Sequence, residues 1–386
     1  MAGAPPTVYV HIGLAKTGTT YLQQLMWENR ESLAKAGLLY PGRRRTEHFL
    51  AAVDLRADPS PRAPGSLQPG TWDALVEEAH SAPDRAVISH EWLARATTAQ
   101  AQRAVSSLEP AEVHLIVTMR DLARLLPALW QELVKNGRVL TYADFLGKLS
   151  RGLDHFPAGQ NVMGVLSRWD AVPPERVHVV TVPRPGTDRD LLWERFALVM
   201  GVDPAVATIP TERTNDSLSV VESELLRRLN PALKKRFAGP AYYRVVKDRF
   251  VAEVLAGTSP HPRLKVPVEH RDWMTERAQE MIDGLASGGF DIVGDLADLK
   301  PEFGDPVVAD PADVTDRQLW ELAAQCLVTV VGDNHDRRRK AGRARRRRVP
   351  RVARRLPRRV ARRLPPDVRS RMRSGVRRVR GAMKPS

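Results

Sequence analysis

Short apolar segments alternate with helical segments through the first half of the chain, and this alternation restricts the fold more than any other feature. Clusters of Val, Ile, Leu and Met four to eight residues long predict strands, whereas apolar residues spaced three and four apart predict helices. Strands that alternate with helices pair in parallel and carry helices on both faces of the sheet. We therefore predict an α/β protein with a central parallel sheet. The expected strands are Val8 to Ile12, Ala86 to Ser89, Val113 to Met119 and Val177 to Val182.

The regions between and beyond these strands are expected to be helices joined by loops. The stretch from Asp58 to Gly70 contains four prolines and is predicted to be a loop. After Gly201 the pattern changes, and the second half, from about residue 211, is predicted to be mainly helical. Thr211 to Asp216 should form a loop, and Ser217 should be the N-cap of the next helix. The expected helices are about Thr17 to Ala36, Trp72 to His80, Leu122 to Asn136, Asp190 to Met200, Ser217 to Leu229, Trp273 to Leu285 and Asp316 to Val330.

Charge is divided unevenly along the chain. Residues 337–386 hold 23 Lys and Arg against one acid, Asp367, whereas residues 1–336 hold 37 basic and 44 acidic side chains. The net charge of +15 therefore comes from the C-terminal segment and says little about what residues 1–336 bind. Prolines 350, 357 and 365 would break a helix there. We predict a domain over residues 1–336 and a disordered Arg/Pro-rich basic tail over residues 337–386.

The tail is the part of the chain expected to contact an anionic membrane or nucleic acid. Val352, Leu356, Val360 and Leu364 are four residues apart and could dock on an anionic lipid surface. No run of about 18 apolar residues is present, so no membrane-spanning helix is expected. The chain start lacks the regions of a signal peptide, and Cys326 is the only thiol. A reducing, cytoplasmic location is predicted, with the tail as a means of peripheral attachment.

The segment Gly13-Leu-Ala-Lys-Thr-Gly-Thr-Thr-Tyr-Leu22 connects the first predicted strand to the first predicted helix. Such a turn presents backbone N–H groups and the positive end of a helix dipole to an anion. Gly18 lets the backbone approach the anion, Lys16 adds a full charge, and three threonines supply hydroxyl donors. In the nucleotide-triphosphatase loop, G-x-x-x-x-G-K-[ST], the lysine follows the second glycine. Here the lysine precedes that glycine, which predicts an anion site of another kind.

On these residues the chain resembles the PAPS-dependent sulfotransferases, in particular the bacterial branch whose first loop reads K-T-G-T-T. PAPS is 3′-phosphoadenosine 5′-phosphosulfate, and PAP is the product that remains after its sulfuryl group is transferred. The resemblance extends over roughly Val8 to Leu229 and implies the P-loop-like sulfotransferase fold. It also implies that Lys16 stabilises charge on the departing phosphate. The residues that would hold the 5′-phosphosulfate are Lys16, Thr17, Gly18, Thr19 and Thr20.

A second part of the family's pattern follows the third predicted strand. Arg120 stands there at the start of a helix, where the family places the arginine that binds the donor's 3′-phosphate. The family has a serine eight residues later, and this chain has Ala128 instead. The loss of one neutral hydrogen bond costs about 0.5–1.5 kcal/mol. Donor binding is therefore expected to survive, with Arg124 compensating.

The catalytic base of the family lies near the end of the second strand, where this chain reads Ser89-His90-Glu91. The cytosolic animal enzymes use a histidine there, and several heparan-modifying and bacterial enzymes use a glutamate. Adjacent residues at a strand end point in different directions, so one of the two is expected to face the sulfur. The Ser-x-Glu ending is similar to that of the bacterial members, and we predict Glu91 rather than His90 as the base.

The resemblance implies a sulfotransferase that moves a sulfuryl group from PAPS to a hydroxyl or amine, with no metal required. No residue pattern in the sequence identifies the acceptor, and a carbohydrate, a glycolipid or a small metabolite is compatible with the sequence. One alternative is a P-loop kinase-like, ATP-dependent enzyme, which the displaced lysine disfavours. The other is a catalytically inactive binding protein that acts through its basic tail, which Ala128 favours.

Overall fold

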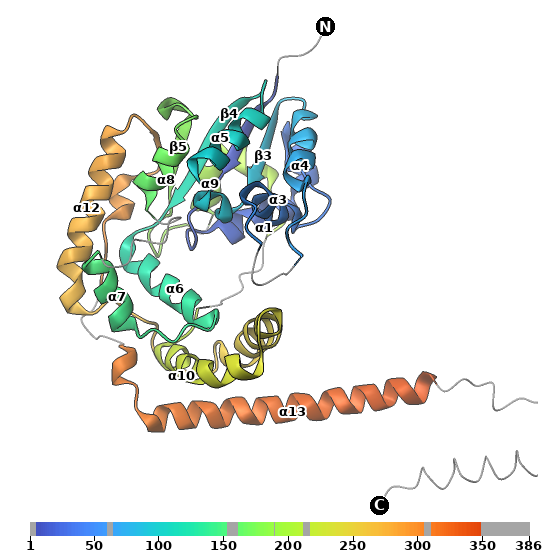
Figure 1. Cartoon of the computed structure of the whole chain (residues 1–386), viewed down its shortest axis with the longest axis vertical. Helices are drawn as coiled ribbons and strands as arrows, with labels where there is room; N and C mark the ends of the chain where they lie inside the picture. Colours follow the sequence, from blue (N-terminus) through green and yellow to red (C-terminus); the bar gives the residue numbers. More distant parts are fainter. Residues whose placement is uncertain are drawn as a thin grey trace, which may run out of the picture. The chain divides into compact units, whose positions relative to one another are not determined.

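Six parallel strands form the central sheet of the protein in a computed structural model (Figure 1). The order across the sheet is β2-β3-β1-β4-β5-β6, and each neighbouring pair is parallel. The α/β class and the parallel sheet are thus confirmed. The four predicted strands agree with β1, β3, β4 and β5 to within one residue at each end. The strands are β1 (Thr7–His11), β2 (Leu38–Leu39), β3 (Arg85–Ser89), β4 (Glu112–Met119), β5 (Val177–Thr181) and β6 (Asp291–Val293).

The structure describes residues 5–59, 65–152, 161–188, 190–210, 217–304 and 310–348. The predicted loop at Thr211–Asp216 lies outside these ranges. The chain divides into two units, Met1–Cys326 and Leu327–Ser386. The sheet and the candidate site belong to the first unit.

Helices account for most of the remaining structure, as the spacing of apolar residues predicts. None of the helices in the described ranges is long and apolar enough to cross a membrane. A π-helix, η4 (Tyr243–Leu255), and two short 3-10 helices, η1 (Glu91–Arg95) and η6 (Leu296–Leu299), also border the site described below. The α-helices are α1 (Thr19–Glu28), α2 (Arg30–Lys35), α3 (Glu47–Arg56), α4 (Thr71–His80), α5 (Thr98–Ser107), α6 (Leu122–Lys135), α7 (Tyr142–Ser150), α8 (Val162–Arg168), α9 (Leu191–Val199), α10 (Val220–Arg236), α11 (Pro240–Tyr242), α12 (Arg271–Ser287) and α13 (Asp316–Arg348).

Several helix boundaries differ from the sequence prediction, and the structure explains three of the differences. Asn29 divides the first predicted helix into α1 and α2, because its buried side chain bonds to Leu25 O and to the backbone of Ile209. The N-cap of α10 is Ser219 rather than Ser217, and Ser219 forms a reciprocal capping box with Glu222. The prediction of a disordered tail is wrong for residues 337–348, which continue α13, since Arg, Lys and Ala favour helix and no proline occurs before position 350. The rest of the tail lies outside the described residues.

Strand residues alternate between two apolar layers, one on each face of the sheet. Val8 and Val10 pack in the layer that contains α3, α4, α5, α8 and α12. Tyr9, which lies between them, packs in the layer formed by α1, α2 and α9. The central strands are therefore covered on both faces, as all-parallel sheets require.

The carboxyl ends of β1, β3 and β4 lie side by side at the point where the connections of the sheet change direction. From β1 the chain builds β3 on one side and β4 on the other, in register with Val10 opposite both Ile88 and Leu115. Ligands of open α/β sheets bind in the crevice at such a point. The three predicted site segments follow these three strands. Helices α6 and α10 lie beyond this end of the sheet (Figure 1).

Candidate active site

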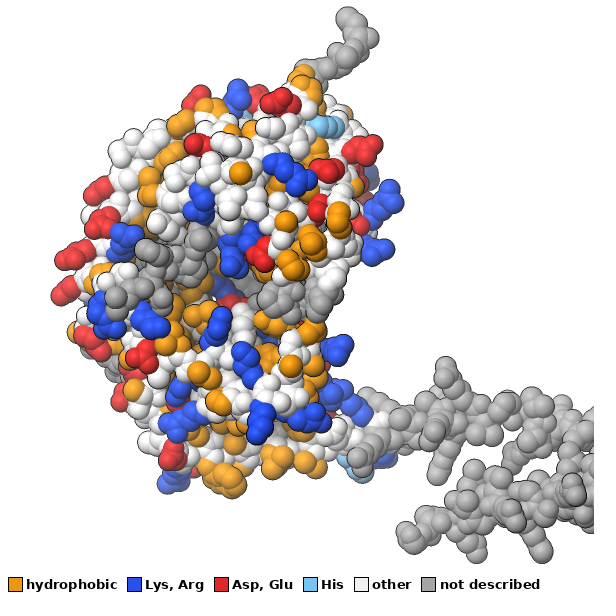
Figure 2. Space-filling view, viewed as in Figure 1, with side chains coloured by type: hydrophobic (Ala, Val, Ile, Leu, Met, Phe, Trp, Pro, Cys, Tyr) orange, Lys and Arg blue, Asp and Glu red, His pale blue; other side chains and the backbone are white. Residues whose placement is uncertain are grey.

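A cavity of about 1600 Å³ lies at this carboxyl edge. Its walls come from the loops after β1, β3, β4 and β5, from α6 and η4, and from residues 263–266 and 298–304. Figure 2 shows a hollow near the middle of the molecule with Lys and Arg side chains beside it. The predicted site residues on its described walls are Lys16, Gly18, Thr19, Thr20, Glu91, Arg120 and Arg124; Thr17 and His90 are not among the lining residues.

The loop after β1 turns into α1 through residues with positive φ, namely Gly13, Lys16 and Gly18 at 51°, 70° and 92°. The positive φ favours glycine at position 18, and a Cβ atom there would also lie 2.5 Å from Leu192 Cδ2, so the Leu192 side chain would have to move. Gly18 is the N-cap residue of α1 and makes no side-chain cap bond. The first turn of α1 therefore presents its N–H groups to the cavity, which is the arrangement that binds anions.

The side chain of Thr17 serves the loop rather than the cavity. It is fully buried, and its hydroxyl donates to Leu14 O and lies 2.7 Å from Thr118 Oγ1 on β4. The expectation that the Thr17 hydroxyl would contact the donor is therefore corrected. Among the predicted threonines, Thr19 and Thr20 line the cavity, and of these Thr20 is exposed.

Beneath the loop, His11 joins the ends of three strands in a buried polar cluster. Its Nδ1 lies 2.7 Å from Ser89 Oγ and its Nε2 lies 3.3 Å from Thr118 Oγ1. Burial, reinforced by nearby His90, lowers the pKa of His11 to about 3. The imidazole is thus neutral in the folded protein and acts as a scaffold for the loop.

This buried neutral histidine predicts acid sensitivity. The unfolded state binds a proton near pH 6.5 and the folded state only near pH 3, so stability present above pH 6.5 is lost as pH falls toward 3. His11 alone contributes a slope of about 1.4 kcal/mol per pH unit in that window. The variant His11→Gln keeps polar partners for Ser89 and Thr118 but does not titrate. Urea unfolding at pH 7 and pH 5 should show a smaller loss of stability for His11→Gln than for the parent; equal losses would contradict this role.

Lys16 forms an ion pair that the sequence did not predict. Its Nζ lies 2.7 Å from Glu132 Oε2 on α6, and Lys247 from η4 pairs with the other carboxylate oxygen. Burial alone would raise the pKa of Glu132, but the two lysines outweigh it and hold the pKa below its ordinary range. Glu132 lies one helical turn after Ala128, so the 3.6-residue period could have identified it as cavity-facing. Lys247 could not have been found, because its contact with Glu132 joins two segments 115 residues apart in the chain.

Arg120 lies against the phosphate loop. Its Nη1 donates to Lys16 O at 3.3 Å, so the two predicted anion sites adjoin each other. Its Nε is buried and has no hydrogen-bond partner among the described residues. Burial and the neighbouring Arg124 lower the pKa of Arg120 to about 10, which leaves it charged at neutral pH. A buried cation with an unsatisfied donor favours the binding of an anion.

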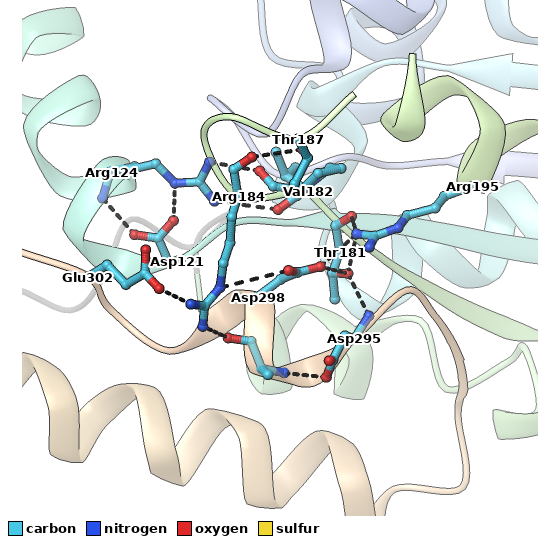
Figure 3. A network of polar contacts seen from close by, with 12 residues as sticks. Asp121, Arg124, Thr181, Val182, Arg184, Thr187, Arg195, Asp295, Asp298 and Glu302 are labelled. Atoms are coloured by element: carbon cyan, nitrogen blue, oxygen red, sulfur yellow. Dashed lines mark hydrogen bonds and ion pairs between the residues drawn. The ribbon is translucent and has the colours of Figure 1, made fainter. Parts of the chain in front are cut away.

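Arg124 is committed to holding the backbone around the site (Figure 3). It pairs with Asp121, and its Nη1 donates to Pro183 O at 2.8 Å. Its other terminal nitrogen donates to Val182 O, so three of its contacts are structural. Arg124 lines the cavity while its side chain holds the loop after β5, and its compensation for Ala128 stays a prediction.

The same loop is fixed from its other side by a second set of ion pairs (Figure 3). Arg195 donates to Thr181 O and to Asp298, and Arg184 pairs with Asp298 and Glu302. These contacts tie β5 and the loop after it to η6 and to the segment that follows η6. The walls of the cavity from both segments are therefore held rigidly in place.

Glu91 and His90 have different environments at the end of β3. Glu91 lines the cavity, with its side chain 27% exposed and its Oε2 3.5 Å from Gln23 Nε2. The Nδ1 atom of His90 accepts a hydrogen bond from Trp92 N, so a neutral ring carries its proton on Nε2. Burial lowers the pKa of His90. Neither ring nitrogen is then a free acceptor for a proton, whereas the Glu91 carboxylate is open to the cavity.

The described residues contain no group of three or more His, Cys, Asp or Glu side chains that could hold a metal ion. Comparison of the chain with protein-family models, curated proteins and solved structures finds no match. The chemistry of the site therefore rests on its own geometry: an uncapped helix N-terminus, Lys16 and Arg120 beside it, and the Glu91 carboxylate on the wall.

Proposed function

We propose that this chain is a sulfotransferase that uses PAPS as donor. The observation that carries the proposal is the meeting, in one cavity, of the α1 N-terminus, Lys16 and the unsatisfied Nε of Arg120, with Glu91 on the wall. Two adjoining cationic sites suit a nucleotide with phosphate groups at both its 5′ and 3′ positions. The resemblance of the first loop to K-T-G-T-T supports the same donor.

In this proposal the two cationic sites divide the donor between them. The N–H groups of Thr19 and Thr20 and the ammonium of Lys16 hold the 5′-phosphosulfate, while Arg120 holds the 3′-phosphate. To bind the donor, Lys16 exchanges its partner Glu132 for an oxygen of the donor, and Lys247 remains to balance Glu132. Ala128 leaves the 3′-phosphate with one hydrogen bond fewer, a cost of about 0.5–1.5 kcal/mol.

The transfer step requires a base and a cation on opposite sides of the sulfur. The acceptor oxygen or nitrogen attacks the sulfur in line, and a bond from it to sulfur forms while the bond from sulfur to the 5′-phosphate oxygen breaks. Glu91 takes the acceptor's proton, and the electron pair of the broken bond leaves with the phosphate of PAP. Lys16 stabilises the negative charge that develops on that phosphate.

Calorimetry with PAP tests the donor site. PAP is expected to bind, and Arg120→Ala should weaken it by about 10- to 150-fold, since a hydrogen bond to a charged group contributes about 1.5–3 kcal/mol. Arg317→Ala is the matched control, because Arg317 is 87% exposed and does not line the cavity. Binding of ATP with magnesium but not of PAP would contradict the proposal and favour the kinase-like alternative.

A further inference from the structure

The wall of the cavity carries a surplus of positive side chains. Its described lining residues include eleven Lys and Arg against seven Asp and Glu. Residues 1–336 as a whole have the opposite balance, 37 basic and 44 acidic side chains. A mildly acidic domain thus concentrates its cations on the wall of one cavity, where low-dielectric walls focus their field toward a negatively charged ligand.

Three of these cations lie on walls supplied by the second half of the chain and by the end of α6. Arg138 follows α6, Lys265 lies between η4 and α12, and Lys300 follows η6. No carboxylate in the described ranges pairs with any of the three side chains. Lys16 and Arg184 differ in this respect, because Lys16 is paired with Glu132, and Arg184 with Asp298 and Glu302.

The cavity also has room for a second ligand beside the donor. At about 1600 Å³ it exceeds the roughly 300–1000 Å³ that a single small ligand occupies. Cations that share a cavity without carboxylate partners repel one another, and a bound anion removes that repulsion. The phosphate groups of the donor are accounted for by Lys16, Arg120 and the α1 N-terminus, so Arg138, Lys265 and Lys300 are left for another anion.

We propose that the acceptor is itself anionic, and that Arg138, Lys265 and Lys300 bind its carboxylate, sulfate or phosphate groups. This inference rests on the proposed sulfotransferase function, because it assigns these cations to the second substrate of the same cavity. It narrows the acceptor from any hydroxyl or amine to one on a negatively charged molecule.

Hydrogen exchange of the full chain, read peptide by peptide, tests this proposal without knowledge of the natural acceptor. The protein is saturated with PAP and titrated with sulfated maltohexaose, and neutral maltohexaose of the same length is the control ligand. Because the readout is local, binding to the basic tail is separated from binding in the cavity. The sulfated probe should protect residues 260–266 and 296–304, and the neutral probe should not.

In the variant Lys265→Gln/Lys300→Gln, the concentration of sulfated probe that gives half-maximal protection should rise about tenfold, since two charge contacts are removed. Lys35→Gln/Lys235→Gln removes two exposed lysines that do not line the cavity and should change nothing. PAP should still protect residues 13–21 in both variants. Protection confined to residues 337–386, or equal protection by the neutral probe, would overturn the anionic acceptor while leaving the donor site intact. Absence of PAP protection in the parent chain would instead refute the sulfotransferase proposal.

Discussion

Glu91→Gln is expected to lower sulfuryl-transfer turnover by about 10²–10⁴, the usual contribution of general-base catalysis. The amide has nearly the shape of the carboxylate but cannot take a proton from the acceptor. No hydrogen bond or ion pair joins Glu91 to Lys16 or Arg120 among the described residues, so the affinity for PAP should stay within about twofold. The measurement is single-turnover transfer from labelled PAPS, with calorimetry of PAP alongside.

His90→Ala is the matched control for this prediction. The His90 ring accepts from Trp92 N and packs against Phe49, so its removal should loosen η1 and cost at most about tenfold in turnover. If His90→Ala abolishes turnover and Glu91→Gln stays active, His90 rather than Glu91 is the base.

Lys16→Met should lower kcat by about 10²–10³, which is the usual effect of removing one group that stabilises transition-state charge. The methionine keeps the length of the side chain and removes the ammonium that lies beside the phosphate loop. The fold should persist, because Lys247 still balances Glu132. Thermal unfolding measures whether the fold persists, and rapid-quench kinetics at saturating PAPS measure the loss of kcat.

Glu132→Gln provides the opposite test of the same ion pair. Glu132 holds Lys16 at 2.7 Å in the structure, and its charge would repel the incoming phosphosulfate. Its neutralisation should therefore leave kcat within about threefold and strengthen PAP binding by up to about tenfold. A Glu132→Gln variant as inactive as Lys16→Met would show that the pair, rather than the lysine alone, is required.

Structure that depends on residues close together in the sequence could be predicted, whereas contacts between residues far apart in the sequence could not. Four strands of five to eight residues carry enough apolar residues to be recognised, but β2 and β6 have two and three residues and leave no pattern. The Ser219–Glu222 capping box was readable in the sequence, as serine followed three residues later by glutamate. Its neighbour Ser217 competed for the same role.

At the site too, local features could be predicted from the sequence, and contacts between distant segments could not. The positions of Gly18, Lys16 and Arg120 follow from the strand–loop–helix order, so the sequence could place them at one edge of the sheet. The inward turn of Thr17 depends on Thr118, and the pairing of Lys16 depends on Glu132, each about a hundred residues away. The commitment of Arg124 to the carbonyls of the loop after β5 likewise appears only once β4 and β5 are adjacent.

Transfer of labelled sulfur from PAPS tests the central claim most directly. The full chain is incubated with the donor and with three acceptor pools: anionic oligosaccharides, neutral glycolipids and small hydroxylated or aminated compounds. The account predicts label on an acceptor with PAP formed in equal amount, both lost in Glu91→Gln. PAP that binds tightly while no pool gains label above the Glu91→Gln background would contradict it, and would identify the chain as a nucleotide-binding protein without transferase activity.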